Sequence, residues 1–126
     1  MKKAAVKLIK SIRYHYPKIP IMMNRGYAIL PEVASQINMI LGESVITTYD
    51  FATKTYKDAT PSDIEWQMDK LMSGKKINSK LKIFTLDYWN PEDTAKIKEL
   101  YAIERKNGFI PYVSTVLLNT VIPEPK

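Results

Sequence analysis

Several polar and aromatic side chains of this sequence follow apolar runs, at positions where the strands of an α/β protein would end. Asn24 and Arg25 follow the run 19–23, and Asp87 follows the run 81–86. Carboxylates can transfer protons, while amides and arginine can hold hydroxyl groups. Gathered at one rim, such residues are typical of a sugar-binding site. The candidates are Glu43 and Asp87 as carboxylates, with Asn24, Arg25, Ser44, Tyr49, Tyr88, Trp89 and Tyr112 as substrate-binding residues.

Apolar spacing and capping residues predict the elements that would carry these side chains. Helices are expected at residues 2–15, 31–41, 61–73 and 91–106, and strands at 19–23, 44–48, 81–86 and 109–113. Residues 60–63 (TPSD) combine an N-cap threonine, a proline in the first turn and an acid close behind it. Gly74 is expected to end the helix that starts there. A polar loop is expected from Tyr49 to Ala59.

The expected fold class is α/β. Helices and strands alternate without a hairpin signal, which favours parallel pairing through right-handed crossovers. About four βα units fit two architectures: a small open sheet, or half of a (β/α)8 TIM barrel, which usually needs about 250 residues. In either architecture, chemistry collects at the carboxyl ends of the strands.

The composition excludes several classes of site. The chain has 126 residues, enough for a single α/β domain spanning residues 1–126, with an ordinary hydrophobic fraction of 45%. It has no cysteine, and His15 is its only histidine. Thiolate and histidine-rich metal sites are therefore disfavoured, as is a Ser-His-Asp triad. No P-loop or dinucleotide-binding glycine motif follows any expected strand. We expect no metal and no cofactor.

The excess positive charge lies in one segment. Residues 1–18 contain six basic residues and no acid, while the rest of the chain has 13 of each. Such a basic amphipathic helix and linker could bind anionic membranes or nucleic acid. The apolar face lacks Trp or Phe anchors, which favours a helix packed on the sheet with a solvated basic face. We therefore expect neither nucleic acid nor membrane as a partner. Lys7 and Lys10 interrupt any signal-peptide core, and the compartment stays undetermined.

Four segments together resemble one known family. They are Met23-Asn24-Arg25-Gly26, Gly42-Glu43-Ser44, Phe84-Thr85-Leu86-Asp87-Tyr88 and 107–113 (NGFIPYV), and the resemblance covers roughly residues 15–120. In this order and spacing they are similar to the second half of the endo-α-1,4-polygalactosaminidase family, glycoside hydrolase family 114. The family has an eight-stranded barrel, so the resemblance implies the C-terminal half of one.

The resemblance also implies roles for individual residues. Glu43 matches the strand-end glutamate taken as the general acid/base, while Asp87, Tyr88 and Asn24 match residues that line the cleft. Arg25 departs from the family's usual Gln-Asn-Gly turn. The partner carboxylate belongs to an earlier strand of the family's barrel, outside these four units. Asp87 and Asp50 are the local candidates to replace it.

The expected function follows from this resemblance. It is a glycoside hydrolase-like barrel half that acts on an amino-sugar polysaccharide when the barrel is complete. The expected partners are the polysaccharide and either a missing N-terminal half-barrel or a second copy of the chain. The alternative is a non-catalytic α/β module that binds carbohydrate or a protein. Members of the family are often secreted.

Overall fold

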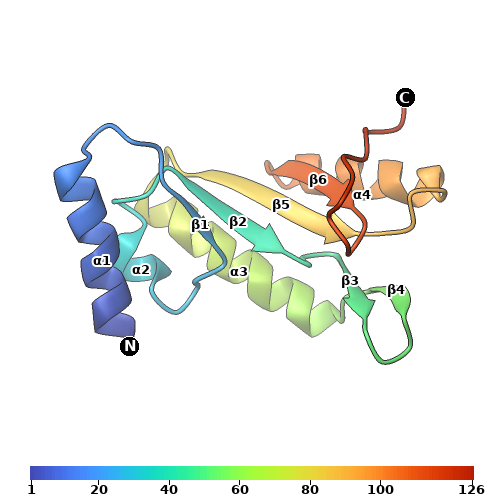
Figure 1. Cartoon of the computed structure of the whole chain (residues 1–126), viewed down its shortest axis with the longest axis horizontal. Coiled ribbons are helices and arrows are strands. Elements are labelled where there is room, and N and C mark those ends of the chain that lie inside the picture. The colour runs from blue at the N-terminus through green and yellow to red at the C-terminus, as the bar shows by residue number, and fades with distance from the viewer.

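The computed structural model describes all residues 1–126, and it places a parallel sheet against helices (Figure 1). The elements in chain order are α1 (Lys2–His15), β1 (Met22–Asn24), α2 (Leu30–Val33), β2 (Met39–Glu43), β3 (Thr47–Asp50), β4 (Thr55–Asp58), α3 (Pro61–Ile77), β5 (Lys82–Tyr88), α4 (Thr94–Lys106) and β6 (Ile110–Ser114).

The main sheet has four strands in the order β1-β2-β5-β6, and every neighbouring pair is parallel. This order follows the chain, as expected for successive right-handed βα units. The strands run side by side with α3 along one flank, and α4 lies beside β6 (Figure 1). The predicted α/β class and four-stranded parallel sheet are confirmed.

Only one face of this sheet is covered by helices. Along β2 and β5, buried residues such as Ile40 and Ile83 alternate with more exposed ones, because successive side chains point to opposite faces. The covered face forms the main core with α2, α3 and α4, and the buried residues of that core are Tyr27, Leu30, Ala34, Ile37, Ile40, Val45, Ile46, Leu71, Leu81, Ile83, Ile97, Leu100, Tyr101, Phe109 and Val113.

We call the other side of the sheet the open face. By alternation and strand register it carries Met22, Asn24, Met39, Leu41, Glu43, Lys82, Phe84, Leu86, Tyr88, Ile110, Tyr112 and Ser114. Met22 and Ile110 remain 44% and 45% exposed. In a closed barrel, side chains at such positions would fill the interior.

Two predicted elements in the middle of the chain were wrong. The helix expected at 31–41 is a single turn, α2, and the strand of the sheet is β2 at Met39–Glu43 rather than 44–48. The segment predicted as that strand contains a bend and the start of β3. Asn38 fixes the start of β2, because its side-chain oxygen accepts hydrogen bonds from Ile21 N (2.9 Å) and Arg13 (2.7 Å).

The segment from Tyr49 to Ala59, which was expected to be a polar loop, instead forms most of an antiparallel hairpin, β3–β4. Asp50 stabilises its turn by accepting from Ala52 N (2.9 Å) and by pairing with Lys57 (2.8 Å). Lys54, with φ 56°, takes the left-handed conformation that tight hairpin turns often require. The hairpin lies beyond the carboxyl end of β2 (Figure 1).

The other element boundaries shift by a few residues. Helix α3 runs through Gly74 to Ile77, because Gly74 packs against Leu30 and Leu81 instead of ending the helix. Helix α4 begins at Thr94, with Asp93 rather than a residue near 90 as its N-cap: the Asp93 carboxylate accepts from Lys96 N (3.1 Å).

Helix α1 packs beside α2, with Val6 as its only buried residue. Arg13 ties its end to the domain by donating to the carbonyl oxygens of Gln36 (2.9 Å), Pro17 (2.8 Å) and Ile19 (2.8 Å). No helix has the length and hydropathy of a membrane-spanning segment.

Candidate functional site

Glu43 is the last residue of β2, and its side chain projects from the open face. Asn24 Nδ2 donates to one carboxylate oxygen (3.2 Å), and the Tyr88 hydroxyl donates to the other (2.5 Å). The three residues come from three neighbouring parallel strands, whose carboxyl ends meet at one rim. The sheet register explains both contacts. On one side, Asn24 of β1 pairs with Leu41, which lies two residues before Glu43 on the same face of the sheet. On the other side, Glu43 pairs with Leu86 of β5, and Tyr88 lies two residues further along that strand on the same face.

Tyr88 remains a neutral donor to Glu43. Burial raises the pKa of the Tyr88 hydroxyl above its ordinary range, and the hydrogen bond to Glu43 raises it further. Both oxygens of Glu43 are thus held by neutral donors, which fix the direction of the carboxylate.

Directly after Glu43 the chain makes a sharp turn at Ser44. Ser44 has φ 54°, in the left-handed region that is uncommon for residues other than glycine, asparagine and aspartate. Ser44 N donates to Leu86 O (2.8 Å), and Ser44 O accepts from Gln67 Nε2 (2.7 Å). The Gln67 side-chain oxygen accepts from the Tyr27 hydroxyl (2.8 Å). This Tyr27–Gln67–Ser44 chain joins the loop after β1, helix α3 and the end of β2.

Sequence reasoning missed Tyr27 and Gln67. Both are buried, at 8% and 4% exposure. A signal was present for Gln67, which lies on the apolar side of α3 with Ile64 and Leu71 and is buried there with its amide satisfied. A polar residue on a buried helix face needs a hydrogen-bond partner, which can mark a functional neighbourhood.

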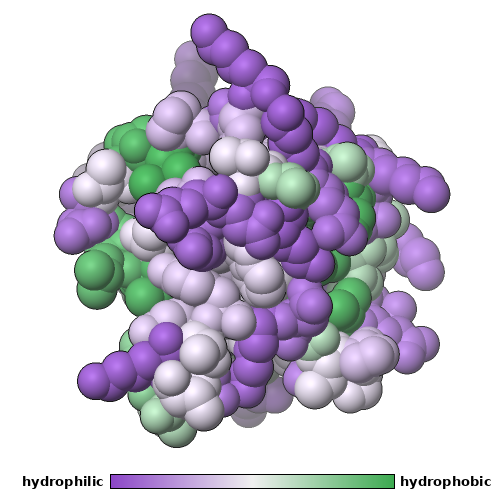
Figure 2. Space-filling view, turned by 90° about the vertical axis from the view of Figure 1, so that its right-hand side faces the viewer, coloured by the Kyte–Doolittle hydropathy of each residue, from purple (hydrophilic) through white to green (hydrophobic).

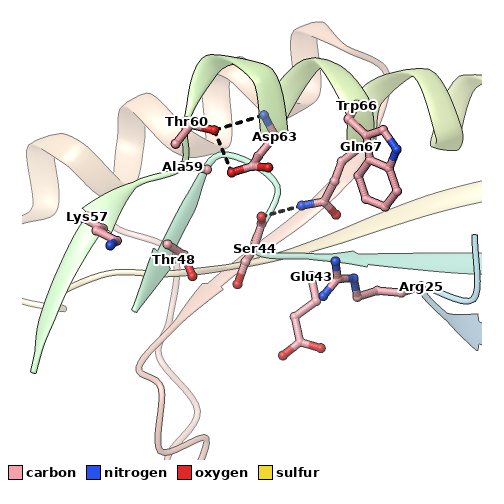
Figure 3. Close-up of a pocket in the computed structure, with 10 residues that line it drawn as sticks. All are labelled: Arg25, Glu43, Ser44, Thr48, Lys57, Ala59, Thr60, Asp63, Trp66 and Gln67. Carbon is pink, nitrogen blue, oxygen red and sulfur yellow. Dashed lines mark hydrogen bonds between the residues drawn. The ribbon is translucent and has the colours of Figure 1, made fainter. Parts of the chain in front are cut away.

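A cavity of about 350 Å³ opens beside Glu43 (Figure 3). Arg25 reaches toward Glu43 from the loop after β1, Trp66 and Gln67 descend from α3, and Thr48 and Lys57 come from the hairpin. The remaining lining residues are Ser44, Ala59, Thr60 and Asp63. Asp63 lies in the first turn of α3, where the Thr60 hydroxyl oxygen accepts from Asp63 N (3.2 Å) and the hydroxyl donates to its carboxylate (2.6 Å).

A second hollow of about 300 Å³ lies on the other side of Glu43. It is lined by Glu43, Ser44, Thr48, Tyr49, Phe51, Tyr88, Val116 and Leu118. Tyr49 packs edge-on against Phe51 and Tyr56, with ring centroids 5.1 and 5.0 Å apart. Of the residues predicted to gather at this rim, Asn24, Arg25, Glu43, Ser44, Tyr49 and Tyr88 therefore lie together.

Asp87 does not lie in this cleft, so the expectation that it is the main polar neighbour of Glu43 was wrong. Tyr88 faces the open side, and the preceding residue of the strand must face the helices. Asp87 is 1% exposed, and its Oδ1 accepts from Ile46 N and Thr47 N (2.8 Å each). The carboxylate therefore anchors the chain between β2 and the hairpin. Asp50, the other local candidate, is paired with Lys57 in the hairpin.

Behind Asp87 lies a second buried acid, Glu104 of α4, with no exposed surface. Both Glu104 oxygens are buried without a geometric hydrogen-bond partner, and the Asp87 carboxyl group is their charged neighbour. Burial raises the pKa of Glu104, and the neighbouring Asp87 raises it further. Burial also raises the pKa of Asp87, against the effect of its backbone hydrogen bonds. Two carboxyl groups in such a place share a proton.

Trp89 and Tyr112 lie apart from Glu43. Trp89 Nε1 donates to Asp93 (3.0 Å), its ring packs near Tyr56, and Lys96 Nζ lies 5.5 Å from the ring centroid. The Tyr112 hydroxyl accepts from Ile122 N (2.9 Å) in the C-terminal segment. Neither ring lines the two hollows beside Glu43. No three His, Cys, Asp or Glu side chains lie close enough together to hold a metal ion.

The one-sided parallel sheet, with its polar groups at the carboxyl rim, defines the α/β fold of half a (β/α)8 barrel. Among solved structures, the glycoside hydrolase domain of PelA from Pseudomonas aeruginosa has this fold: the TM-score is 0.84 at 24% identity. The match covers 98% of this chain and 48% of that domain, so the chain spans about half its length. A variant of the same domain in which a glutamate is replaced by alanine matches equally. No family model and no curated protein sequence matches.

Proposed function

We propose that this chain is one half of a glycoside hydrolase barrel, with Glu43 as its catalytic carboxylate and an amino-sugar polysaccharide as its substrate. The observation that carries the proposal is the position of Glu43. It stands at the carboxyl rim of a parallel sheet, between two hollows, with both oxygens held by Asn24 and Tyr88. The amino-sugar class rests on the resemblance of residues 15–120 to the polygalactosaminidases.

A glycosidase places two carboxyl groups across the scissile bond: one protonates the leaving oxygen, and the other acts as a base or nucleophile. Glu43 can take the first role, since its carboxyl group is directed into the cleft. The other local acids are engaged elsewhere: Asp87 with the backbone at 46–47, Asp63 with Thr60, and Asp50 with Lys57. We infer that the complementary half, either an N-terminal half-barrel or a second copy of this chain, supplies the second carboxylate.

The test is hydrolysis of partially deacetylated galactosaminogalactan by this chain, alone at high concentration and together with the complementary half. The completed barrel should release reducing ends. Glu43→Gln should abolish release while sugar binding survives, because the amide keeps the shape and the acceptor oxygen of the carboxylate but cannot donate the proton. Glu92→Gln, in an exposed loop, is the matched control and should leave turnover unchanged. Undiminished turnover in the Glu43→Gln protein would remove Glu43 from the mechanism.

A non-catalytic carbohydrate-binding module is the second candidate. It is favoured because this chain supplies only one carboxylate to the cleft, Glu43, that is not engaged in a helix cap, the hairpin or the buried backbone. The same assay separates the two. A completed barrel that binds the polymer through Asn24, Glu43 and Tyr88 but never cleaves it would identify a binding module.

A further inference from the structure

A further hollow lies between the hairpin and the segment that follows β6. Its volume of about 450 Å³ is within the usual range of ligand-binding sites. Tyr49 and Val116 line both this hollow and the one that contains Glu43, so the two adjoin. We call the new one the hairpin hollow. A polysaccharide that passes Glu43 on its Tyr49 side would continue into it.

The C-terminal segment forms the wall of the hairpin hollow opposite the hairpin. After β6 this segment turns toward β3 and β4 (Figure 1). Near one end, Val116 N donates to the Tyr56 hydroxyl of the hairpin (3.3 Å). Near the other end, Ile122 N donates to the Tyr112 hydroxyl of β6 (2.9 Å). The stretch between these two contacts is therefore held at both ends, and the hollow exists before any ligand enters it.

The side chains around the hairpin hollow match the groups of an N-acetylated sugar. Tyr49 and Tyr56 pack with ring centroids 5.0 Å apart and planes inclined by 66°, and such rings offer apolar surface to a sugar ring. On the other wall, Asn119 and Thr120 are exposed, so their amide and hydroxyl groups are open to a ligand. An acetamido group has one N–H and one carbonyl oxygen, which these two side chains can pair with. Val116 supplies apolar surface for its methyl group.

Charge distinguishes the hairpin hollow from its neighbour. Lys54 is the only charged residue that lines the hairpin hollow, and it forms no ion pair. Asp50, four residues earlier, is paired with Lys57 instead. The hollow that contains Glu43 has the reverse character, with one acid and no cation among its lining residues. A protonated amino sugar is therefore attracted beside Glu43 and repelled beside Lys54, whereas a neutral N-acetylated unit meets no repulsion there.

We propose that the hairpin hollow is a subsite for an N-acetylated unit of the polysaccharide. Asn119 and Thr120 pair with the acetamido group, and Lys54 disfavours a unit with a free amine. The proposal rests on the proposed function, since the polymer reaches this hollow by passing Glu43. It adds a pattern to the substrate, in which the unit beside Glu43 has a free amino group and a unit further along the chain is acetylated.

The test is calorimetric binding of two oligomers of equal length, one of N-acetylgalactosamine and one of galactosamine, to the whole chain carrying Glu43→Gln. This substitution prevents cleavage and removes the carboxylate that attracts free amines. At about 0.15 M salt, where distant charges are screened, the acetylated oligomer should bind tighter. Added Lys54→Glu should strengthen binding of the galactosamine oligomer about threefold, the effect of one exposed charge pair, and leave the acetylated one unchanged. Lys98→Glu makes the same charge change on α4, outside the hollow, and should keep the ratio of the two affinities.

A second variant tests the contact with the acetamido group. Asn119→Ala removes the side-chain amide from the exposed wall, so it should weaken binding of the acetylated oligomer about fivefold, the effect of one hydrogen bond. Binding of the galactosamine oligomer should stay the same.

The outcomes separate this inference from the proposed function. Equal changes for both oligomers in Asn119→Ala, or a Lys54→Glu protein that behaves like Lys98→Glu, overturn the subsite and leave the hydrolase standing. Failure of the acetylated oligomer to bind also overturns the subsite, while hydrolysis by the completed barrel decides the proposed function separately. Selective changes in a completed barrel that cleaves no polysaccharide support the subsite and overturn the hydrolase.

Discussion

At the scale of single residues, the two faces of β5 separate two kinds of acid chemistry. Tyr88 faces the cleft and holds Glu43, whereas Asp87, its neighbour in sequence, faces α4 and Glu104. The cleft acid keeps hydrogen-bond donors and access to solvent, while the buried pair must share a proton to remain in the core. Strand β5 therefore supports the cleft carboxylate of Glu43 through Tyr88, and it also carries a buried acid, Asp87, whose ionisation costs stability.

The buried pair predicts a pH dependence of stability that Glu104→Gln should remove. The native chain holds the Glu104 proton up to a pKa of about 9, whereas the unfolded chain releases it near the ordinary value of 4.5. Stability from Glu104 is therefore full below pH 4.5 and falls as the pH rises toward 9, by at most about 1.4 kcal/mol per unit. Urea unfolding at several pH values should show that the free energy of unfolding of the variant rises relative to that of the wild type as the pH rises. Glu92→Gln serves as control, and a pH-independent difference would contradict the prediction.

At the scale of elements, the apolar pattern of the sequence predicts which residues are buried better than it predicts whether they form a helix or a strand. The helix predicted at 31–41 rested on the helical spacing of Val33, Ala34, Ile37, Ile40 and Leu41, and all of these except Leu41 are buried. Their spacing fits a helix, but the structure breaks it into one turn, a bend and a five-residue strand. In so short a strand, the alternation of Ile40 and Gly42 is too brief to compete with a helical pattern.

The candidate site was predictable in part, for a similar reason. Strand ends and a family resemblance led to Asn24, Glu43 and Tyr88, which meet as expected. Period-two alternation alone could have shown that Asp87 and Tyr88 cannot share a face. The Tyr27–Gln67 link was not predictable in this way, because it joins residues 40 positions apart. The hairpin pairs nearby residues, such as Thr47 with Asp58, but the polar composition of its segment predicted a loop.

The Tyr27–Gln67–Ser44 chain predicts energetic coupling between the loop after β1 and helix α3. Gln67→Leu keeps the volume but leaves Ser44 O and the Tyr27 hydroxyl unpaired, which should destabilise the fold by about 1–3 kcal/mol. Combined with Tyr27→Phe, the loss should be smaller than the sum, with a coupling of at least about 0.5 kcal/mol. Urea unfolding of the four proteins measures this coupling. Gln36→Leu is the control, because the Gln36 side chain bonds only to the neighbouring Ser35 hydroxyl. Strict additivity would show that the two residues act separately.

At the scale of the whole molecule, the open face of the sheet has no helix over it, and apolar residues such as Met22 and Ile110 stay 44% and 45% exposed there. Figure 2 shows green apolar side chains in separate groups between purple charged ones. The sheet's two edge strands, β1 and β6, have no partner on their outer sides. Uncovered sheet faces and free edges favour association with another chain, and the match covers only 48% of the PelA domain.

This geometry predicts that the chain associates with itself when no complementary half is supplied. Sedimentation should show species larger than a monomer. Phe84→Lys, at the centre of the open face, should shift the distribution toward monomer while far-ultraviolet circular dichroism stays unchanged. Leu8→Lys, on the exposed side of α1, should leave the distribution as it is. A compact monomer at high protein concentration would favour a small open sheet over a half-barrel.

The placement of the two tryptophans has a spectroscopic consequence. Trp66 forms one wall of the cavity beside Glu43, while Trp89 is held by Asp93 and packs near the hairpin ring of Tyr56. The chain has no other indole, so its tryptophan fluorescence comes from two residues with different neighbours. Emission from Trp66 should respond to a molecule entering the cavity, and emission from Trp89 to displacement of the hairpin. Replacing either indole with phenylalanine would give the unlabelled protein a separate optical reporter for each event.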